Sequence, residues 1–107
     1  FAQDHGVCNT LGFRIGDFAY SPDWVRMNDK TVEKLKGVKT WVVSAARLSE
    51  PHHSTHADLP MVLKMISMVN PQLVYLTHMN SDMDYDTILG KLPYNVRPAY
   101  DGLVINV

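Results

Sequence analysis

The sequence predicts an α/β fold, because short β-prone apolar runs alternate along it with segments that carry apolar residues at helical spacing. The expected order of elements is β-β-α-β-α-β-α-β-β. Strands and helices that alternate in this way usually form a largely parallel sheet with helices packed on it. With 107 residues the chain forms at most one domain, large enough for a modest core.

Composition and charge exclude several classes of protein. Hydrophobic residues make up 46% of the chain and charged residues 20%, as in ordinary soluble globular domains. The formal net charge of −1 gives no field that would favour nucleic acid or an anionic membrane. No apolar run approaches membrane-spanning length, so we expect no membrane partner. Because Cys8 is the only cysteine, the chain has no disulfide framework, and we expect a reducing, cytoplasmic setting.

The first part of the chain, residues 6–23, predicts a β-hairpin with its turn at residues 16–17. His5 precedes the first strand and Asp23 follows the second. Both are candidate site residues, although a loop histidine and a turn or cap aspartate are the plainer interpretations. The odd-numbered apolar positions that indicate the hairpin are Val7, Leu11, Phe13 and Ile15.

A short helix and a buried strand follow the hairpin. Asn28 or Asp29 can cap a helix that runs through Lys36, and Gly37 ends it. Residues 40–45 then predict a strand buried on both faces, since neither face is clearly polar.

The loop after this strand carries three histidines, His52, His53 and His56. Such a cluster can be a metal-binding loop, but more often one member is functional and its neighbours are solvated. We select His56, because it lies nearest the next helix, and helix amino termini help to hold anions.

Residues 58–70 form the clearest amphipathic helix, which Pro71 ends. Methionines are usually core filler, but here the apolar surface covers more than half of the helix. We expect the excess to cover a missing part of the protein or a second subunit. The main apolar stripe is Leu59, Val62, Leu63, Ile66 and Val69, and the adjoining one is Met61, Met65 and Met68.

Residues 73–76 predict a buried strand that stops at Thr77-His78. In sheets of this class, chemistry collects just beyond the carboxyl ends of the strands. Histidine is also the commonest metal ligand, which makes His78 a candidate. The plainer alternative is a strand-end histidine that is hydrogen-bonded to the loop.

The remaining residues predict a short helix over 85–92, then strands over 95–99 and 103–107 joined by a turn at residues 100–102. Three aspartates near this helix suggest calcium by number, but they lack the glycine and terminal glutamate of a calcium-binding loop. We interpret them as caps and solvated acids: Asp82, Asp84 and Asp86.

Five motifs in the same order resemble the C-terminal half of a metallo-β-lactamase-fold hydrolase. They read D-H-G…L-G-F-R, A-Y-S-P-D, P-H-H-S-T-H-A-D-L, Y-L-T-H-M…D-M-D-Y and A-Y-D-G-L-V-I. The subgroup that they resemble most is the phosphodiesterases that open ribosyl 1,2-cyclic phosphate. The resemblance covers nearly the whole chain.

This resemblance implies that residues 1–107 are half of an αββα sandwich with two divalent metal ions, zinc or manganese, at one edge. His5 and His78 are then metal ligands, and Asp23 bridges both ions. His56 is catalytic and not a ligand: it faces the phosphate, where an imidazole can stabilise charge or protonate the leaving oxygen. The implied substrate is a small cyclic phosphate ester.

The chain departs from the family pattern in two places. The motif H-x-H-x-D-H, which belongs to the N-terminal half, is absent, so these residues complete neither metal site, and we expect the chain to be inactive alone. Ser44 stands where relatives often carry an acid. The chain also opens with Phe1, and we expect it to be cut from a longer protein.

Two alternatives stay open: another hydrolase of the same fold, such as a thioesterase or a tRNA 3′-end nuclease, or a non-catalytic fragment that self-associates. The lack of a basic, aromatic patch counts against nucleic acid. We expect one sheet face to pair with the missing N-terminal half or with a second copy. The candidates for that face are Leu11, Phe13, Trp41, Val43 and part of the methionine stripe.

Overall fold

The computed structural model describes residues 1–47, 56–79, 83 and 85–106. The strands are β1 (Ala2–Asp4), β2 (Asn9–Leu11), β3 (Phe13–Ile15), β4 (Phe18–Ser21), β5 (Thr40–Ser44), β6 (Leu73–Thr77) and β7 (Val96–Pro98). The helices are α1 (Asp29–Leu35), α2 (Leu59–Val69) and α3 (Tyr85–Leu89).

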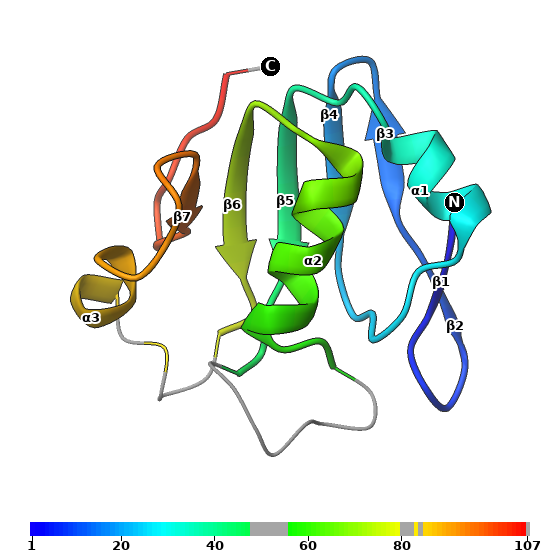
Figure 1. The fold of residues 1–107 in the computed structure, drawn as a ribbon, viewed down its shortest axis with the longest axis horizontal. Helices are drawn as coiled ribbons and strands as arrows, with labels where there is room; N and C mark the ends of the chain where they lie inside the picture. The colour runs from blue at the N-terminus through cyan, green and yellow to red at the C-terminus, as the bar shows by residue number, and fades with distance from the viewer. Residues whose placement is uncertain (48–55, 80–82, 84, 107) are drawn as a thin grey trace.

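The strands form two sheets (Figure 1). The larger has the order β3-β4-β5-β6-β7, with β3 antiparallel to β4 and the other neighbours parallel. A helix joins each parallel strand to the next, as right-twisted sheets of this class require. The predicted α/β class is confirmed. Because β4 to β7 are parallel, their carboxyl ends meet at one edge.

Local sequence explains the two longer helices. The Asn28 side chain accepts a hydrogen bond from the Thr31 amide at 2.9 Å and caps α1. Asp58 caps α2 in the same way through the Met61 amide at 3.1 Å, and Asn70 ends α2 in the left-handed conformation with φ 56°. None of the described helices is long and apolar enough to cross a membrane.

One face of the larger sheet forms the core under α1 and α2, which lie in front of it in Figure 1. Ala19, Trp41 and Val74 are directly paired across three strands, and each is 0% exposed. The Trp41 indole donates to the Ser21 hydroxyl at 2.9 Å, which satisfies its polar edge inside the core.

The opposite face of the sheet, which we call the open face, carries apolar residues that α1 and α2 do not cover. Phe13 pairs with Tyr20, and Tyr20 with Val42, in a row across the strands. Phe13 is 55% exposed and Ile15 77% exposed. Contiguous apolar surface of this kind usually marks an interface.

The prediction of which residues lie on the open face was correct for Phe13 and wrong for Trp41 and Val43. Leu11 is 63% exposed. Trp41 and Val43 are both 0% exposed and point toward the helices. Side chains alternate along a strand, so it is Val42, between them, that belongs to the open face.

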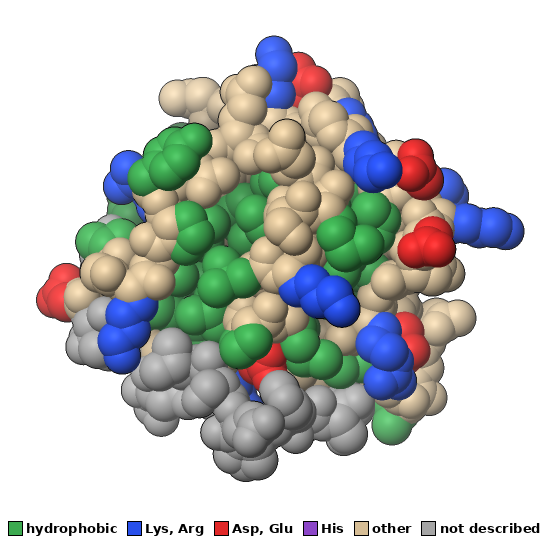
Figure 2. Space-filling model, viewed as in Figure 1, with side chains coloured by type: hydrophobic (Ala, Val, Ile, Leu, Met, Phe, Trp, Pro, Cys, Tyr) green, Lys and Arg blue, Asp and Glu red, His purple; other side chains and the backbone are tan. Residues whose placement is uncertain are grey.

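The methionine stripe of α2 divides between core and surface. Met65 is buried, whereas Met68 is 41% exposed. Together with Met61 and Trp24 they line a groove of about 280 Å³ beside α2. Figure 2 shows this face of the molecule, where hydrophobic side chains gather among lysines and arginines.

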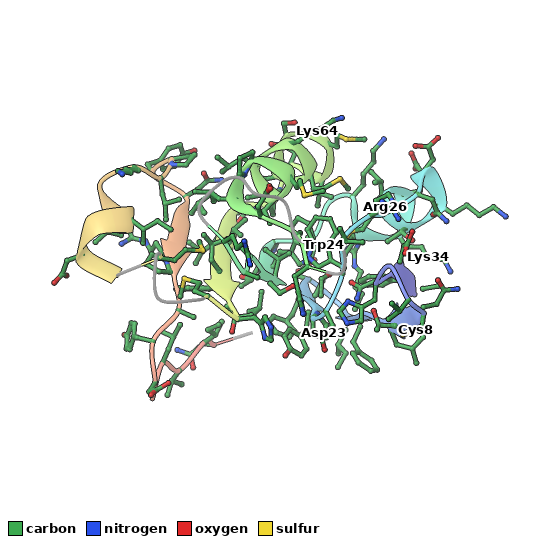
Figure 3. The ribbon with its side chains drawn as sticks, turned by 90° about the horizontal axis from the view of Figure 1, so that it is seen from below. Cys8, Asp23, Trp24, Arg26, Lys34 and Lys64 are labelled. Atoms are coloured by element: carbon green, nitrogen blue, oxygen red, sulfur yellow. The ribbon has the colours of Figure 1, made fainter. Side chains whose placement is uncertain are left out.

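The end of the chain differs from the expectation. β7 pairs in parallel with β6, and residues 103–106 form no strand. A turn at residues 100–102 is present, with Leu103 donating to the Tyr100 carbonyl at 3.0 Å. It directs the chain to the side of the sheet opposite α2 (Figure 3), where Asn106 lines a cavity with Ile15. The turn was predicted correctly, but the residues after it do not pair with β7, although β7 is the edge strand of the sheet.

The orientation of β5 can be tested with one substitution at two sites. Val43→Ala should lower the free energy of unfolding by about 1.5–3 kcal/mol, because two buried methyl groups are lost and a cavity remains. Val104→Ala, at a position that is 80% exposed, should change it by less than about 0.5 kcal/mol. Urea unfolding followed by circular dichroism measures both. A neutral Val43→Ala would mean that Val43 does not face the core.

Candidate metal centre

The four candidate site residues lie at one edge of the molecule, although they come from separate segments. Asp23 follows β4 and His78 follows β6, at the carboxyl ends of two parallel strands. His5 follows β1, and His56 precedes the cap of α2. Figure 3 views this edge from below, with Asp23 near its middle.

Their side chains form one cluster. One possible ligand atom from each of His5, Asp23 and His56 lies within 4.8 Å of the others. The His56 ring meets the His5 ring edge-on, with centroids 4.9 Å apart. It stacks on the His78 ring at 4.8 Å with an interplanar angle of 24°. His56 therefore contacts both other histidines, and the structure brings together all the residues selected from the sequence.

Backbone hydrogen bonds explain why these segments converge. The Val25 amide donates to the Asp4 carbonyl at 2.7 Å, which fixes the chain next to His5. The Ala57 amide donates to the Trp24 carbonyl at 2.8 Å, which fixes the chain next to His56. Both bonds reach the segment directly after Asp23. That segment is the common support for three of the four side chains.

Asp23 and His78 both have positive φ angles, 45° and 58°. This left-handed conformation costs a residue other than glycine about 1–2 kcal/mol, so the surrounding structure must hold it. At Asp23 the support is visible. The Thr10 hydroxyl donates to the Asp23 carbonyl at 2.8 Å, and the Gln3 amide donates to the Pro22 carbonyl at 2.7 Å.

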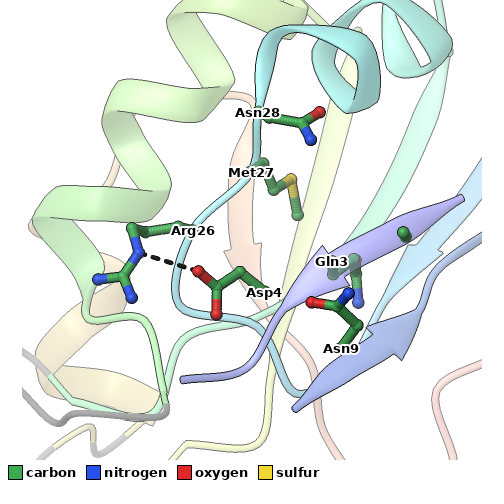
Figure 4. Close-up of a pocket in the computed structure, with 7 residues that line it drawn as sticks. Gln3, Asp4, Asn9, Arg26, Met27 and Asn28 are labelled. Carbon is green, nitrogen blue, oxygen red and sulfur yellow. Dashed lines mark hydrogen bonds and ion pairs between the residues drawn. The ribbon is translucent and has the colours of Figure 1, made fainter. Parts of the chain in front are cut away.

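Beside His5 lies an ion pair between Asp4 and Arg26, with 3.1 Å between Oδ2 and Nε (Figure 4). The Gly6 amide donates to the other carboxylate oxygen at 2.7 Å. This backbone hydrogen bond, followed by the Arg26 guanidinium, lowers the pKa of Asp4 below its usual value. Asp4 thus stays anionic and anchors the short turn that carries His5.

The donor set fits a divalent cation. Imidazole nitrogen and carboxylate oxygen are the ligands that zinc takes, at about 2.0–2.2 Å, and they suit manganese as well. Two ligands of one ion are thus at most about 4.4 Å apart, and the donors of His5, Asp23 and His56 lie within 4.8 Å of one another. Only small side-chain movements would bring His5 and Asp23 around one ion, with the His56 ring beside it.

His78 also lines a cavity of about 300 Å³ beside the cluster, together with Tyr100 and Asp101. Tyr100 and Asp101 were predicted only as part of a turn, and nothing in their pattern indicated that they also line this cavity. Gln3 and Thr10 were not predicted either, because they carry no chemical signature of their own. Only their hydrogen bonds to residues 22 and 23 reveal their role.

Other candidates take no part in the described cluster. The Ser44 hydroxyl is buried and has no hydrogen-bond partner among the residues that the structure describes. Asp86 is exposed in the first turn of α3. His52, His53, Asp82 and Asp84 lie outside the described residues.

Comparisons with known proteins agree on the kind of fold. The model of the family described as "Beta-lactamase superfamily domain" matches residues 1–79. A crystal structure of a new diphosphatase from the PhnP family superimposes with a TM-score of 0.93 at 26% identity. The alignment covers 99% of this chain and 41% of that one, so this chain spans about two fifths of the diphosphatase. No curated protein matches.

The metal centre can be tested at Asp23. Asp23→Asn removes the anionic ligand but keeps the shape of the side chain, and should weaken zinc binding about 100-fold or more. That loss would exceed the 10–100-fold typical of residues that only support ligands. Asp17→Asn is the matched control, because Asp17 pairs with Lys39 on the surface at 3.3 Å. Calorimetric titration of the complete enzyme with zinc measures both, and equal affinities would contradict the assignment.

Proposed function

The chain belongs to the beta-lactamase superfamily, and on that premise we propose that it carries part of the active site of a metal-dependent hydrolase. The observation that supports this most directly is the convergence of His5, Asp23 and His56 donor atoms within 4.8 Å. Divalent cations at such a site supply Lewis acidity and lower the pKa of water. The chain contributes imidazole and carboxylate groups that hold the cations in place.

Within this class we propose a phosphodiesterase that acts on a small cyclic phosphate ester. The sequence motifs resemble such enzymes, and the similar crystal structure is that of a diphosphatase. A diphosphatase and a phosphodiesterase both break a P–O bond with water, so one arrangement of groups can serve either reaction. A thioesterase or a tRNA-processing nuclease remains the alternative, but the described site shows no feature that favours either.

We assign the residues as follows. His5, His78 and Asp23 would hold two divalent ions, zinc or manganese, with Asp23 shared between them. His56 would face the phosphate and protonate the leaving oxygen or stabilise the developing charge. Its ring lies against both other histidines, which supports a role next to the metal ligands. The cavity beside His78, lined also by Tyr100 and Asp101, offers room for the ester.

This division of roles is open to a direct test, because His56 is as close to His5 and Asp23 as a ligand would be. In the complete enzyme, His56→Ala should retain its metal and lose about 10²–10⁴-fold in turnover, as expected for a lost general acid. His78→Ala should lose metal. Metal content by mass spectrometry and hydrolysis of cyclic phosphate diesters measure both variants. Loss of metal from His56→Ala would instead make His56 a ligand.

We propose that the active protein contains a second half, of which this chain is the C-terminal complement. The open face and the 41% coverage of the diphosphatase support this. The second half packs against the open face and supplies the remaining ligands. A second copy of the chain can cover the same apolar surface, but would not bring the motif H-x-H-x-D-H.

The exposed thiol of Cys8 suits a reducing compartment such as the cytoplasm.

On its own, the chain should therefore self-associate through the open face. At about 25 cal/mol per Å², covering a few hundred Å² yields several kcal/mol before the costs of association. Sedimentation at micromolar concentration should show a dimer or larger species. Phe13→Lys should shift it toward monomer, whereas Tyr94→Lys, at a position 91% exposed and outside the sheet, should not. A monodisperse 12.1 kDa monomer that binds no hydrophobic dye would contradict the proposal.

A further inference from the structure

Three successive carbonyls around Asp23 each accept a hydrogen bond from a different segment. The Gln3 side-chain amide binds the Pro22 carbonyl at 2.7 Å, and the Thr10 hydroxyl binds the Asp23 carbonyl at 2.8 Å. The Ala57 amide binds the Trp24 carbonyl at 2.8 Å. The middle bond acts on the residue whose φ of 45° is unfavourable.

We propose that Thr10 is a positioning residue for the metal centre: its hydroxyl holds Asp23 in the left-handed conformation that aims the carboxylate at the cations. The inference rests on the proposed function, since it assigns Asp23 as a metal ligand. Thr10 itself touches neither substrate nor cation in this role. It acts only through the peptide group of Asp23.

The hydroxyl is itself held in place. The Gln3 amide nitrogen lies 3.3 Å from the Thr10 oxygen and donates to it, while the same hydroxyl donates to Asp23. Both the donor and one acceptor site of the hydroxyl are thus used. Gln3 is only 2% exposed, so water cannot readily replace it. The three groups form a short, partly buried relay from Gln3 through Thr10 to Asp23.

The ribbon formed by β1 and β2 gives this relay its rigidity. Gln3 and Thr10 are direct cross-strand partners, so their side chains leave the same face of the ribbon toward residues 22 and 23. The Phe1 nitrogen donates to the Gly12 carbonyl at 2.9 Å, and the Gly12 amide donates to the Phe1 carbonyl at 2.8 Å, which closes the open end of the ribbon. A side chain at Gly12 would collide with the Phe1 ring and would lie 2.7 Å from the Gln3 side-chain oxygen.

Loss of the Thr10 hydroxyl should affect metal binding more than folding. Without it, the Asp23 peptide can relax toward an extended conformation and turn the carboxylate away from His5 and His56. Groups that orient a ligand without touching the metal typically contribute 10–100-fold in metal affinity. A hydroxyl of purely structural importance would contribute to stability alone.

The experiment compares Thr10→Val, which keeps the shape, with Thr10→Ser, which keeps the hydroxyl, in the complete enzyme that contains these 107 residues. Cobalt(II) is the probe, because its visible absorption reports both affinity and the ligand set. Thr10→Val should bind cobalt about 10–100-fold more weakly, with altered absorption. Thr10→Ser should recover to within about threefold of the unaltered chain, since the same bond can form.

A matched control separates positioning from stability. The Thr31 hydroxyl donates to the Ala2 carbonyl at 2.8 Å in the same way, from a residue more buried than Thr10, but reaches no residue next to Asp23. Thr31→Val should lower the free energy of unfolding by about 1 kcal/mol and leave cobalt affinity unchanged. Equal weakening in Thr10→Val and Thr31→Val, or no recovery in Thr10→Ser, would overturn the inference.

Two further outcomes are decisive. If the unaltered complete enzyme binds no cobalt, the proposed metal centre fails, and the role of Thr10 fails with it. If it binds cobalt and Thr10→Val binds equally well, only the role of Thr10 fails. Should Thr10→Val not fold, as judged by circular dichroism, Gln3→Met interrupts the same relay one step earlier. That variant should lower cobalt affinity at least tenfold, and unchanged affinity would overturn the inference.

Discussion

The parallel pairing of β4, β5 and β6 sets the edge of the sheet at which the candidate metal centre forms. It places Ser21, Val43 and Leu76 side by side, so Asp23 and His78 leave the sheet at the same edge. The Ala45 amide extends the ladder by donating to the Thr77 carbonyl at 3.0 Å, directly before His78. Rigid backbone thus lies behind both residues, which is the usual reason why sites form at strand ends.

The cluster departs from regular structure where its chemistry begins. Two of its members adopt left-handed conformations, and the turns that carry them are held by bonds from other segments. Burying polar side chains such as Gln3 costs free energy unless they are hydrogen-bonded. The Gln3 side-chain nitrogen makes two such bonds, whereas its oxygen makes none among the described residues. A preformed site reduces the cost of arranging ligands when an ion binds. The same polar contacts therefore serve the fold and the site.

The two faces of the sheet explain how the fold relates to the proposed function. One face is buried by the chain's own helices, with Trp41 and Val74 fully enclosed. The open face carries Phe13, Ile15 and Tyr20 in contact with solvent. A sheet that is apolar on both faces usually lies inside a layered fold, covered on each side. The proposed second half would account for this asymmetry and would supply the ligands that the chain is expected to lack.

The local structure and the chemistry of this chain could be predicted from its sequence. Its capping residues and helical periodicity predicted α1 and α2 closely, and histidines and an aspartate next to strand ends indicated the candidate site. These signals are local, because a cap or a stripe depends on residues only a few positions apart.

Three features could be seen only in the tertiary structure: which face of β5 is buried, how the last residues run and which groups support Asp23. The run Trp41-Val42-Val43 is apolar at every position, so its pattern does not say which side chains meet the helices. β1 has no apolar periodicity and exists because β2 pairs with it. Gln3 and Thr10 gained their role from contacts with residues 22 and 23, and bonds between such distant segments leave no pattern in the local sequence.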